Sequence, residues 1–86
     1  MTCKIEQHTD GHHTTLRLIG HFQAVHLEMV QAQLERHGPR TVLDLDEVTL
    51  VDVEVVRFLG TCEKAGTALL HCPPYIREWI AREQRP

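Results

Sequence analysis

The sequence predicts an α/β domain with a small mixed β-sheet, in which an N-terminal antiparallel hairpin joins parallel strands and about three helices pack on the sheet. Two observations carry this prediction. Two alternating segments flank Asp10-Gly11, a dipeptide typical of hairpin turns. Each of two later apolar runs follows a segment of helical periodicity, and helical crossovers join parallel strands. A length of 86 residues predicts one domain, residues 1–86.

The hairpin prediction depends on a period of two on both sides of the turn. Cys3 and Ile5 alternate with charged residues over residues 3–8, as in a strand with one solvent-facing side. Residues 14–19 form the return strand, with Leu16 and Leu18 on the side that faces the core.

The first helix is predicted over residues 24–37. Leu27, Val30 and Leu34 recur at three- and four-residue spacing and mark its buried stripe. Gly38 and Pro39 end this helix, because glycine caps helices and proline does not continue them.

The middle of the chain predicts a buried strand, an acidic loop and a second helix. Residues 41–45 are apolar and rich in β-branched side chains, as in a parallel strand. The loop is expected over residues 46–51. Asp52 is a suitable N-cap, because its carboxylate can accept from the amides of the first turn, and Gly66 is the expected stop. The predicted apolar face of the helix comprises Val55, Phe58, Leu59, Cys62 and Ala65.

The C-terminal part predicts one more strand and one more helix. Residues 67–71 are a second short apolar run, which Pro73 and Pro74 interrupt. Proline favours the first turn of a helix, so we expect a helix over residues 75–83. Its predicted apolar face comprises Ile76, Trp79 and Ile80.

The middle segment resembles the STAS domain, the fold of bacterial anti-sigma-factor antagonists and of the cytoplasmic tails of sulfate transporters. That family shows a strand ending in Leu-Asp-Leu, then an apolar residue followed by Asp-Ser-Ser-Gly-Leu and a helix. Residues 43–45 and Val51-Asp52 match this pattern. The phosphorylation motif is degenerate: Val53 and Glu54 replace the hydroxyl pair, and Glu54 stands where the family is phosphorylated. The order of elements extends the resemblance over nearly the whole chain.

The resemblance implies a non-enzymatic module for protein–protein interaction in bacterial signalling, with a kinase-like anti-sigma factor as its partner. One alternative is an accessory subunit of a lipid-transporting ABC system, whose partner would be the transporter ATPase. Another is a non-phosphorylated scaffold of a sensor complex. Glu54 has one charge and two oxygens, whereas a phosphoserine has about −1.5 to −2 charges and three acceptor oxygens. It is therefore either a partial mimic or only a residue that favours the helix start.

Acidic side chains concentrate between Arg40 and Arg57, where a strand ends and a helix begins. Parallel sheets place binding sites at that edge, so we expect a docking surface for a basic partner there. Asp52 and Glu54 also stabilise a helix start by themselves, which is the alternative role for both. The expected partner-binding residues are Asp44, Asp46, Glu47, Asp52, Glu54, Arg57, Thr61 and Lys64.

Composition argues against several classes of protein. A net charge of −3 disfavours nucleic-acid binding, which needs a basic surface. No run of about 18 apolar residues predicts a membrane span. The sequence has no serine, which excludes a serine nucleophile and serine phosphorylation. Three cysteines without a CxxC pair, and a start without an apolar signal segment, favour the reducing cytoplasm.

Histidines are numerous, and three of them, His8, His12 and His13, surround the hairpin turn near Cys3. The chain has no CxxC or HExxH frame, so solvated turn histidines are favoured over a metal site. We therefore expect no catalytic residues, no metal and no cofactor, and a small enzyme or metal carrier ranks last. A homodimer through the edge strand or the last helix stays open.

Overall fold

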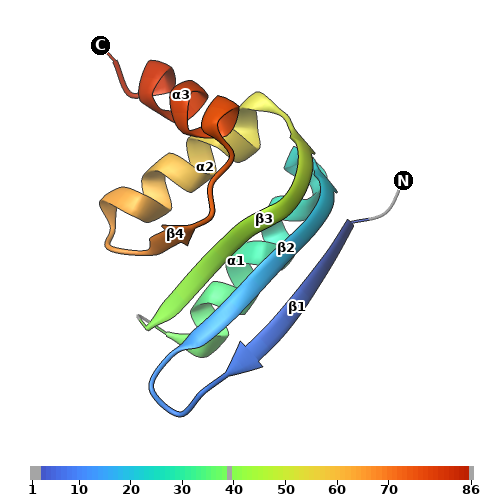
Figure 1. Cartoon of the computed structure of the whole chain (residues 1–86), viewed down its shortest axis with the longest axis vertical. Coiled ribbons are helices and arrows are strands. Elements are labelled where there is room, and N and C mark those ends of the chain that lie inside the picture. The colour runs from blue at the N-terminus through green and yellow to red at the C-terminus, as the bar shows by residue number, and fades with distance from the viewer. Residues whose placement is uncertain (1–2, 39, 86) are drawn as a thin grey trace.

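A computed structural model describes residues 3–38 and 40–85 of the chain and confirms the α/β prediction (Figure 1). The order of elements is β1 (Cys3–Thr9), β2 (Thr14–Phe22), η1 (Ala24–His26), α1 (Leu27–His37), β3 (Thr41–Val51), α2 (Val53–Lys64), β4 (Ala68–Leu70) and α3 (Pro74–Glu83). Gly38 follows α1 as predicted, with a positive φ of 77°, and Pro39 lies outside the described residues.

The described strands form one mixed sheet in the order β1-β2-β3-β4. β1 and β2 make the predicted antiparallel hairpin, while β2, β3 and β4 are parallel neighbours. At the hairpin turn the Asp10 carboxylate accepts from the amides of His12 and His13, both at 3.1 Å, and Gly11 takes a φ of +92°. The two helical crossovers therefore connect parallel strands, as the sequence indicates.

The core lies on one face of the sheet, where α1 covers it from behind in Figure 1. In β2, and in β3 as far as Leu45, inward side chains alternate with side chains on the uncovered face. The buried core residues are Leu16, Leu18, Phe22, Val30, Leu43, Leu45, Val48, Val55, Val56, Leu59, Ile76 and Ile80.

β3 is longer than predicted, and the expected acidic loop over residues 46–51 is wrong. The strand continues to Val51, and Val48 within it is buried. The reason is spacing: inward side chains after Leu45 recur at every third position instead of every second. That spacing hides the strand from a search for alternation.

Two shifts in the pairing of β2 with β3 produce this spacing. Arg17 lies opposite Asp44 and Ile19 opposite Glu47, so β3 holds one extra residue in that interval. A second extra residue lies between Val48 and Leu50. Such bulges bend a strand and increase its twist, and they re-aim the side chains that follow.

β2 also exceeds its prediction, which ended the strand at Ile19. Gly20 takes a φ of +96° inside the strand, next to the second shift in pairing. Pairing then resumes to Phe22, which is buried. The first helix begins with the short 3₁₀ turn η1 instead of a regular α-helical turn.

The second and third helices match their predicted positions closely. Gly66 follows α2 with a φ of +103°, as expected of a helix stop. Ala65 was placed on the apolar face but is exposed at the C-cap. Gly60 is buried where α3 crosses α2, and a Cβ there would lie 3.3 Å from Cγ2 of Ile80. Trp79, predicted as core, packs on the core while only partly buried.

Within the described residues, no helix combines the length and apolar character that crossing a membrane requires.

The bulged path of β3 can be tested by two substitutions in the same strand. Val48→Ala should lower the free energy of unfolding by about 1–2 kcal/mol, because it removes two buried methyl groups. Leu50→Ala should change it by less than about 0.5 kcal/mol, because that side chain is 56% exposed. Urea unfolding of wild type and both variants measures these changes. Uninterrupted alternation from Leu43 and Leu45 would place Val48 and Leu50 on the same exposed face, so equal small effects would contradict the bulges.

Candidate functional site

Asp52 stands at the carboxyl end of β3 and holds two helix starts in place. One carboxylate oxygen accepts from the amide of Val55 at 3.1 Å and caps α2, as predicted. The other accepts from the amide of Ala24 at 2.9 Å, at the start of η1. Burial alone would raise the pKa of Asp52, but these amides, the Glu54 amide and the nearby His21 hold it below its usual range. Asp52 is therefore an ionised structural link at this edge.

Glu54 lies in the first turn of α2 with its side chain 56% exposed. Its carboxylate accepts from Nη1 of Arg57 at 3.2 Å, one turn further along the helix. Val53, at the other position of the hydroxyl pair, is partly buried and has no polar group to offer. Glu54 is thus the member of this pair that a partner could contact through polar atoms.

Arg57 joins α2 to α3. Its Nε donates to Glu83 at 2.8 Å, and this hydrogen bond is the main reason that the pKa of Arg57 is raised. The hydroxyl of Thr61 donates to the carbonyl of Arg57 at 3.0 Å, and Lys64 is exposed one turn beyond. Glu54, Arg57, Thr61 and Lys64 therefore form one continuous polar face, here called the α2 face.

The α2 face borders a shallow hollow of about 220 Å³ between α2 and α3. Arg57, Thr61 and Lys64 line it from one helix, and Glu83 and Gln84 line it from the other side. Gly60 forms part of its floor, since a larger residue would fill the gap against α3.

Of the five predicted acids, Glu54 alone belongs to the α2 face. Asp52 is the N-cap described above, and the other three lie on β3. Asp44 points to the uncovered face of the sheet, because its neighbours Leu43 and Leu45 are both in the core. There Arg17 contacts Asp44 at 3.7 Å and Glu47 at 3.2 Å. Asp46 is exposed at the first bulge. The structure thus divides the predicted surface between the sheet and α2.

Asp44 is 6% exposed and is the centre of a polar network that the sequence did not indicate. One of its oxygens accepts from the amide of Asp46 at 3.0 Å and contacts Nδ1 of His71 at 3.1 Å. Burial works to raise the pKa of Asp44, but these contacts and the charge of Arg17 outweigh it, so the pKa lies below the usual range. His71 carries a φ of 54°, the one positive φ among the described non-glycine residues.

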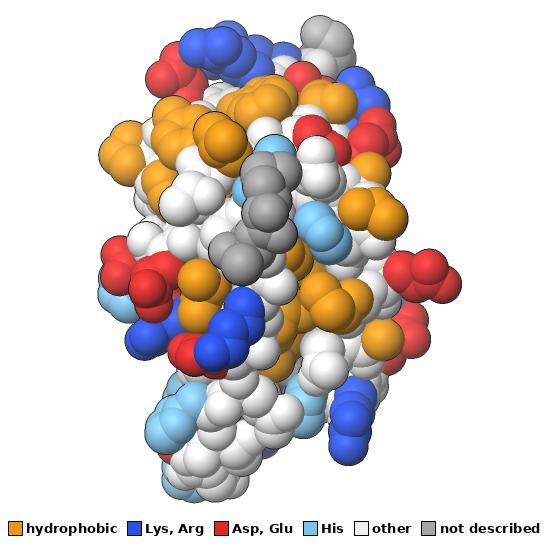
Figure 2. Space-filling model, turned by 90° about the vertical axis from the view of Figure 1, so that its right-hand side faces the viewer, with side chains coloured by type: hydrophobic (Ala, Val, Ile, Leu, Met, Phe, Trp, Pro, Cys, Tyr) orange, Lys and Arg blue, Asp and Glu red, His pale blue; other side chains and the backbone are white. Residues whose placement is uncertain are grey.

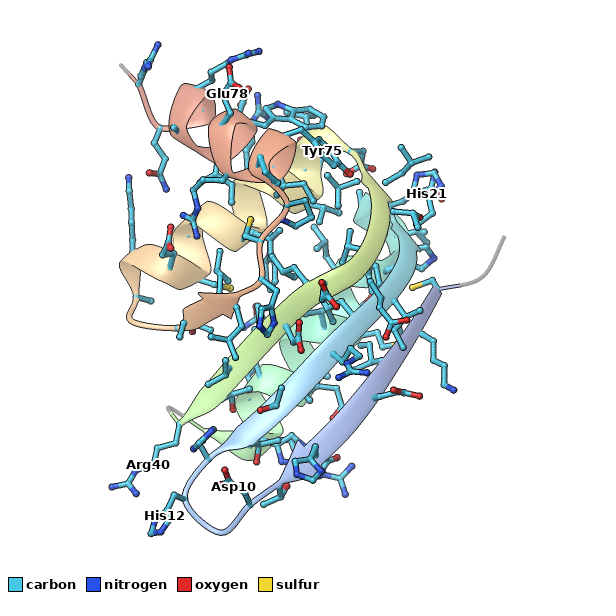
Figure 3. The ribbon with its side chains drawn as sticks, in the orientation of Figure 1. Asp10, His12, His21, Arg40, Tyr75 and Glu78 are labelled. Carbon is cyan, nitrogen blue, oxygen red and sulfur yellow. The ribbon has the colours of Figure 1, made fainter. Side chains whose placement is uncertain are left out.

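Exposed apolar side chains also gather near the end of β3. Leu50 is 56% exposed and Tyr75 is 45% exposed. The Tyr75 hydroxyl donates to the carbonyl of Thr49 at 2.8 Å, which joins the start of α3 to the second bulge; Figure 3 labels Tyr75 at the same end of the molecule as His21. Leu50 was predicted only as part of a loop, and no local pattern marked its apolar side chain as part of a surface.

Among the described residues, no three His, Cys, Asp or Glu side chains lie close enough to hold a metal ion. Burial raises the pKa of the thiols of Cys3, Cys62 and Cys72, which lowers the fraction of reactive thiolate.

No family model matches the chain, and a comparison with curated proteins finds no match. The resemblance of the middle segment to STAS domains therefore stays a prediction.

The network around Asp44 gives a prediction for stability against pH. Asp44→Asn should lower the free energy of unfolding at pH 7 by about 1–3 kcal/mol, because the amide replaces a buried acceptor of several hydrogen bonds. Since the folded pKa of Asp44 is depressed, its contribution is complete above the ordinary value of 3.8 and is lost as the pH falls through the lower folded value. The difference in the free energy of unfolding between wild type and Asp44→Asn should therefore become smaller in acid. Urea unfolding at several pH values measures it.

The control for this experiment is Asp46→Asn, because the Asp46 side chain is exposed two residues away. Its unfolding free energy should follow that of the wild type at every pH. If the free energy of unfolding of Asp44→Asn differs from that of the wild type by the same amount at every pH, the proposed role of the Asp44 charge is contradicted.

Proposed function

We propose that this chain is a STAS-like module that binds a protein partner through the α2 face and performs no chemistry. The observation that carries the proposal is the exposed ion-pair chain Glu54–Arg57–Glu83 at the start of α2. It lies where the resembling family binds and phosphorylates.

The α2 face suits docking because its polar groups are already oriented. Arg57 is held between two carboxylates, so less side-chain freedom is lost when a partner binds. The adjoining hollow offers room for a side chain of the partner. The face carries both signs of charge, which favours a partner of mixed charge over a simply basic one.

Glu54 supports a module whose binding is not switched by phosphorylation. The residue cannot accept a phosphoryl group, and Arg57 offsets part of its charge. A partial mimic would still present two acceptor oxygens to a partner. We infer a cytoplasmic module that binds constitutively, with a kinase-like anti-sigma factor as the first candidate partner. A transporter ATPase or a sensor complex would use the same face.

The partner-binding role can be tested by charge reversal with a matched control. Glu54→Lys should weaken capture of the partner by at least about tenfold, because it reverses the exposed charge and repels Arg57. Glu28→Lys is the control, since Glu28 is exposed at the equivalent position of the first turn of α1. Tagged wild type and both variants are used to isolate partners from the native cell, and mass spectrometry identifies and quantifies them.

A captured kinase, transporter ATPase or sensor component decides among the three roles. Equal capture by wild type and Glu54→Lys would overturn the assignment of the α2 face.

The mimic hypothesis for Glu54 gives a separate prediction. If its charge stands in for a phosphate, Glu54→Ser should change the affinity for the identified partner by more than about twofold. If the residue only favours the helix start, affinity should stay constant while the free energy of unfolding falls by about 0.3–1 kcal/mol. Isothermal titration calorimetry and urea unfolding of the same preparation measure both quantities.

A further inference from the structure

β1 is a long, unprotected edge of the sheet. The described strands place β1 at one end of the order and β4 at the other. β4 has three residues, which is too short to attract another strand, whereas β1 has seven. The backbone groups of β1 that point away from β2 therefore have no strand partner within the described part of the chain. An open edge of this length is a template for strand pairing.

The two sides of β1 differ in character. Cys3 and Ile5 pack partly buried against the core, and Ile5 lies opposite Leu18 of β2. Lys4 and Glu6 lie on the uncovered side, with their charged groups 3.2 Å apart. Figure 2 faces this edge and shows hydrophobic side chains exposed among the charged ones. A partner strand would have to match an apolar row on one side and a charged row on the other.

A second copy of β1 can match both rows only in certain registers. When two copies pair antiparallel, the two-fold axis that relates them passes either through one residue position or between two positions. The apolar sides of both copies lie on the same face of the joined sheet only when the axis passes through a residue position. Centring on Lys4 places lysine opposite lysine, and centring on Glu6 places glutamate opposite glutamate. Centring on Ile5 places Lys4 of each copy opposite Glu6 of the other. Opposite charges in direct cross-strand positions stabilise a sheet, and like charges destabilise it.

We propose that two copies of this chain form a dimer by antiparallel pairing of their β1 strands, centred on Ile5. The dimer joins two sheets into one continuous sheet and places the two Ile5 side chains opposite each other, each next to Leu18 of its own β2. On the other side, Lys4 and Glu6 of both copies form a closed square of alternating charge. The dimer contact is separate from the α2 face, because α2 packs next to β4, at the opposite end of the strand order from β1 (Figure 1).

The register can be tested by single charge reversals and their mixture. Lys4→Glu places glutamates opposite each other at two positions, and Glu6→Lys places lysines there. The dimer dissociation constant of each variant alone should be at least about tenfold higher than that of wild type. Each variant should therefore be mainly monomeric at a concentration where the wild type is half dimeric. Mixed in equal amounts, the two variants should form a heterodimer, because both cross-strand pairs of positions 4 and 6 again join a glutamate to a lysine. Analytical ultracentrifugation measures the mass against the 9.9 kDa of one chain.

Recovery of the dimer in the mixture also shows that both variants are folded and able to pair through β1. Circular dichroism of each variant, compared with wild type, checks the fold independently. A wild type that stays monomeric up to millimolar concentration would overturn the proposal. So would single variants that dimerise as well as wild type, which would point to another interface, or a mixture that stays monomeric.

Discussion

One side chain, Asp52, determines how the helices are attached to the sheet. Its two oxygens accept from the amides of Ala24 and Val55, which lie in the first turns of the helical segments that follow β2 and β3. Both crossovers therefore leave the sheet at a common point, and the directions of α1 and α2 are coupled through one carboxylate. The position of Glu54, two residues later, depends on this link. A feature that the sequence presents as an ordinary helix cap thus also joins two parts of the chain that are distant in sequence.

The elements that local patterns determine could be predicted well. The hairpin followed from alternation and Asp10-Gly11, and α2 followed from Asp52, Gly66 and helical spacing. β3 could be predicted only up to Leu45. Its continuation depends on two extra residues relative to β2, and such bulges are properties of a pair of strands. No pattern within residues 46–51 alone reveals them.

The candidate site was predictable in residue types and only partly in grouping. Glu54, Arg57, Thr61 and Lys64 lie together because helical spacing governs them. The sequence could not show that Glu83 would complete the ion-pair chain, since that contact depends on how α3 packs against Gly60. Likewise, the pairing of Arg17 with Asp44 and Glu47 depends on strand register. Contacts between distant segments separated one predicted acidic surface into two.

The short β4 has a consequence for how the molecule opens. Three residues of pairing attach β4 to β3, whereas α3 is held by the buried side chains of Ile76 and Ile80. Two ion pairs add to this attachment, Arg77 with Glu63 at 2.7 Å and Arg57 with Glu83. Segments with few buried contacts open locally before the whole domain unfolds, and their amide hydrogens exchange with solvent first. β4 is such a segment, because Leu69 is its one partly buried residue. A partner seated across α2 and α3 would restrain the chain on both sides of β4 and slow that exchange, so occupancy of the α2 face would be recorded in the amides of β4.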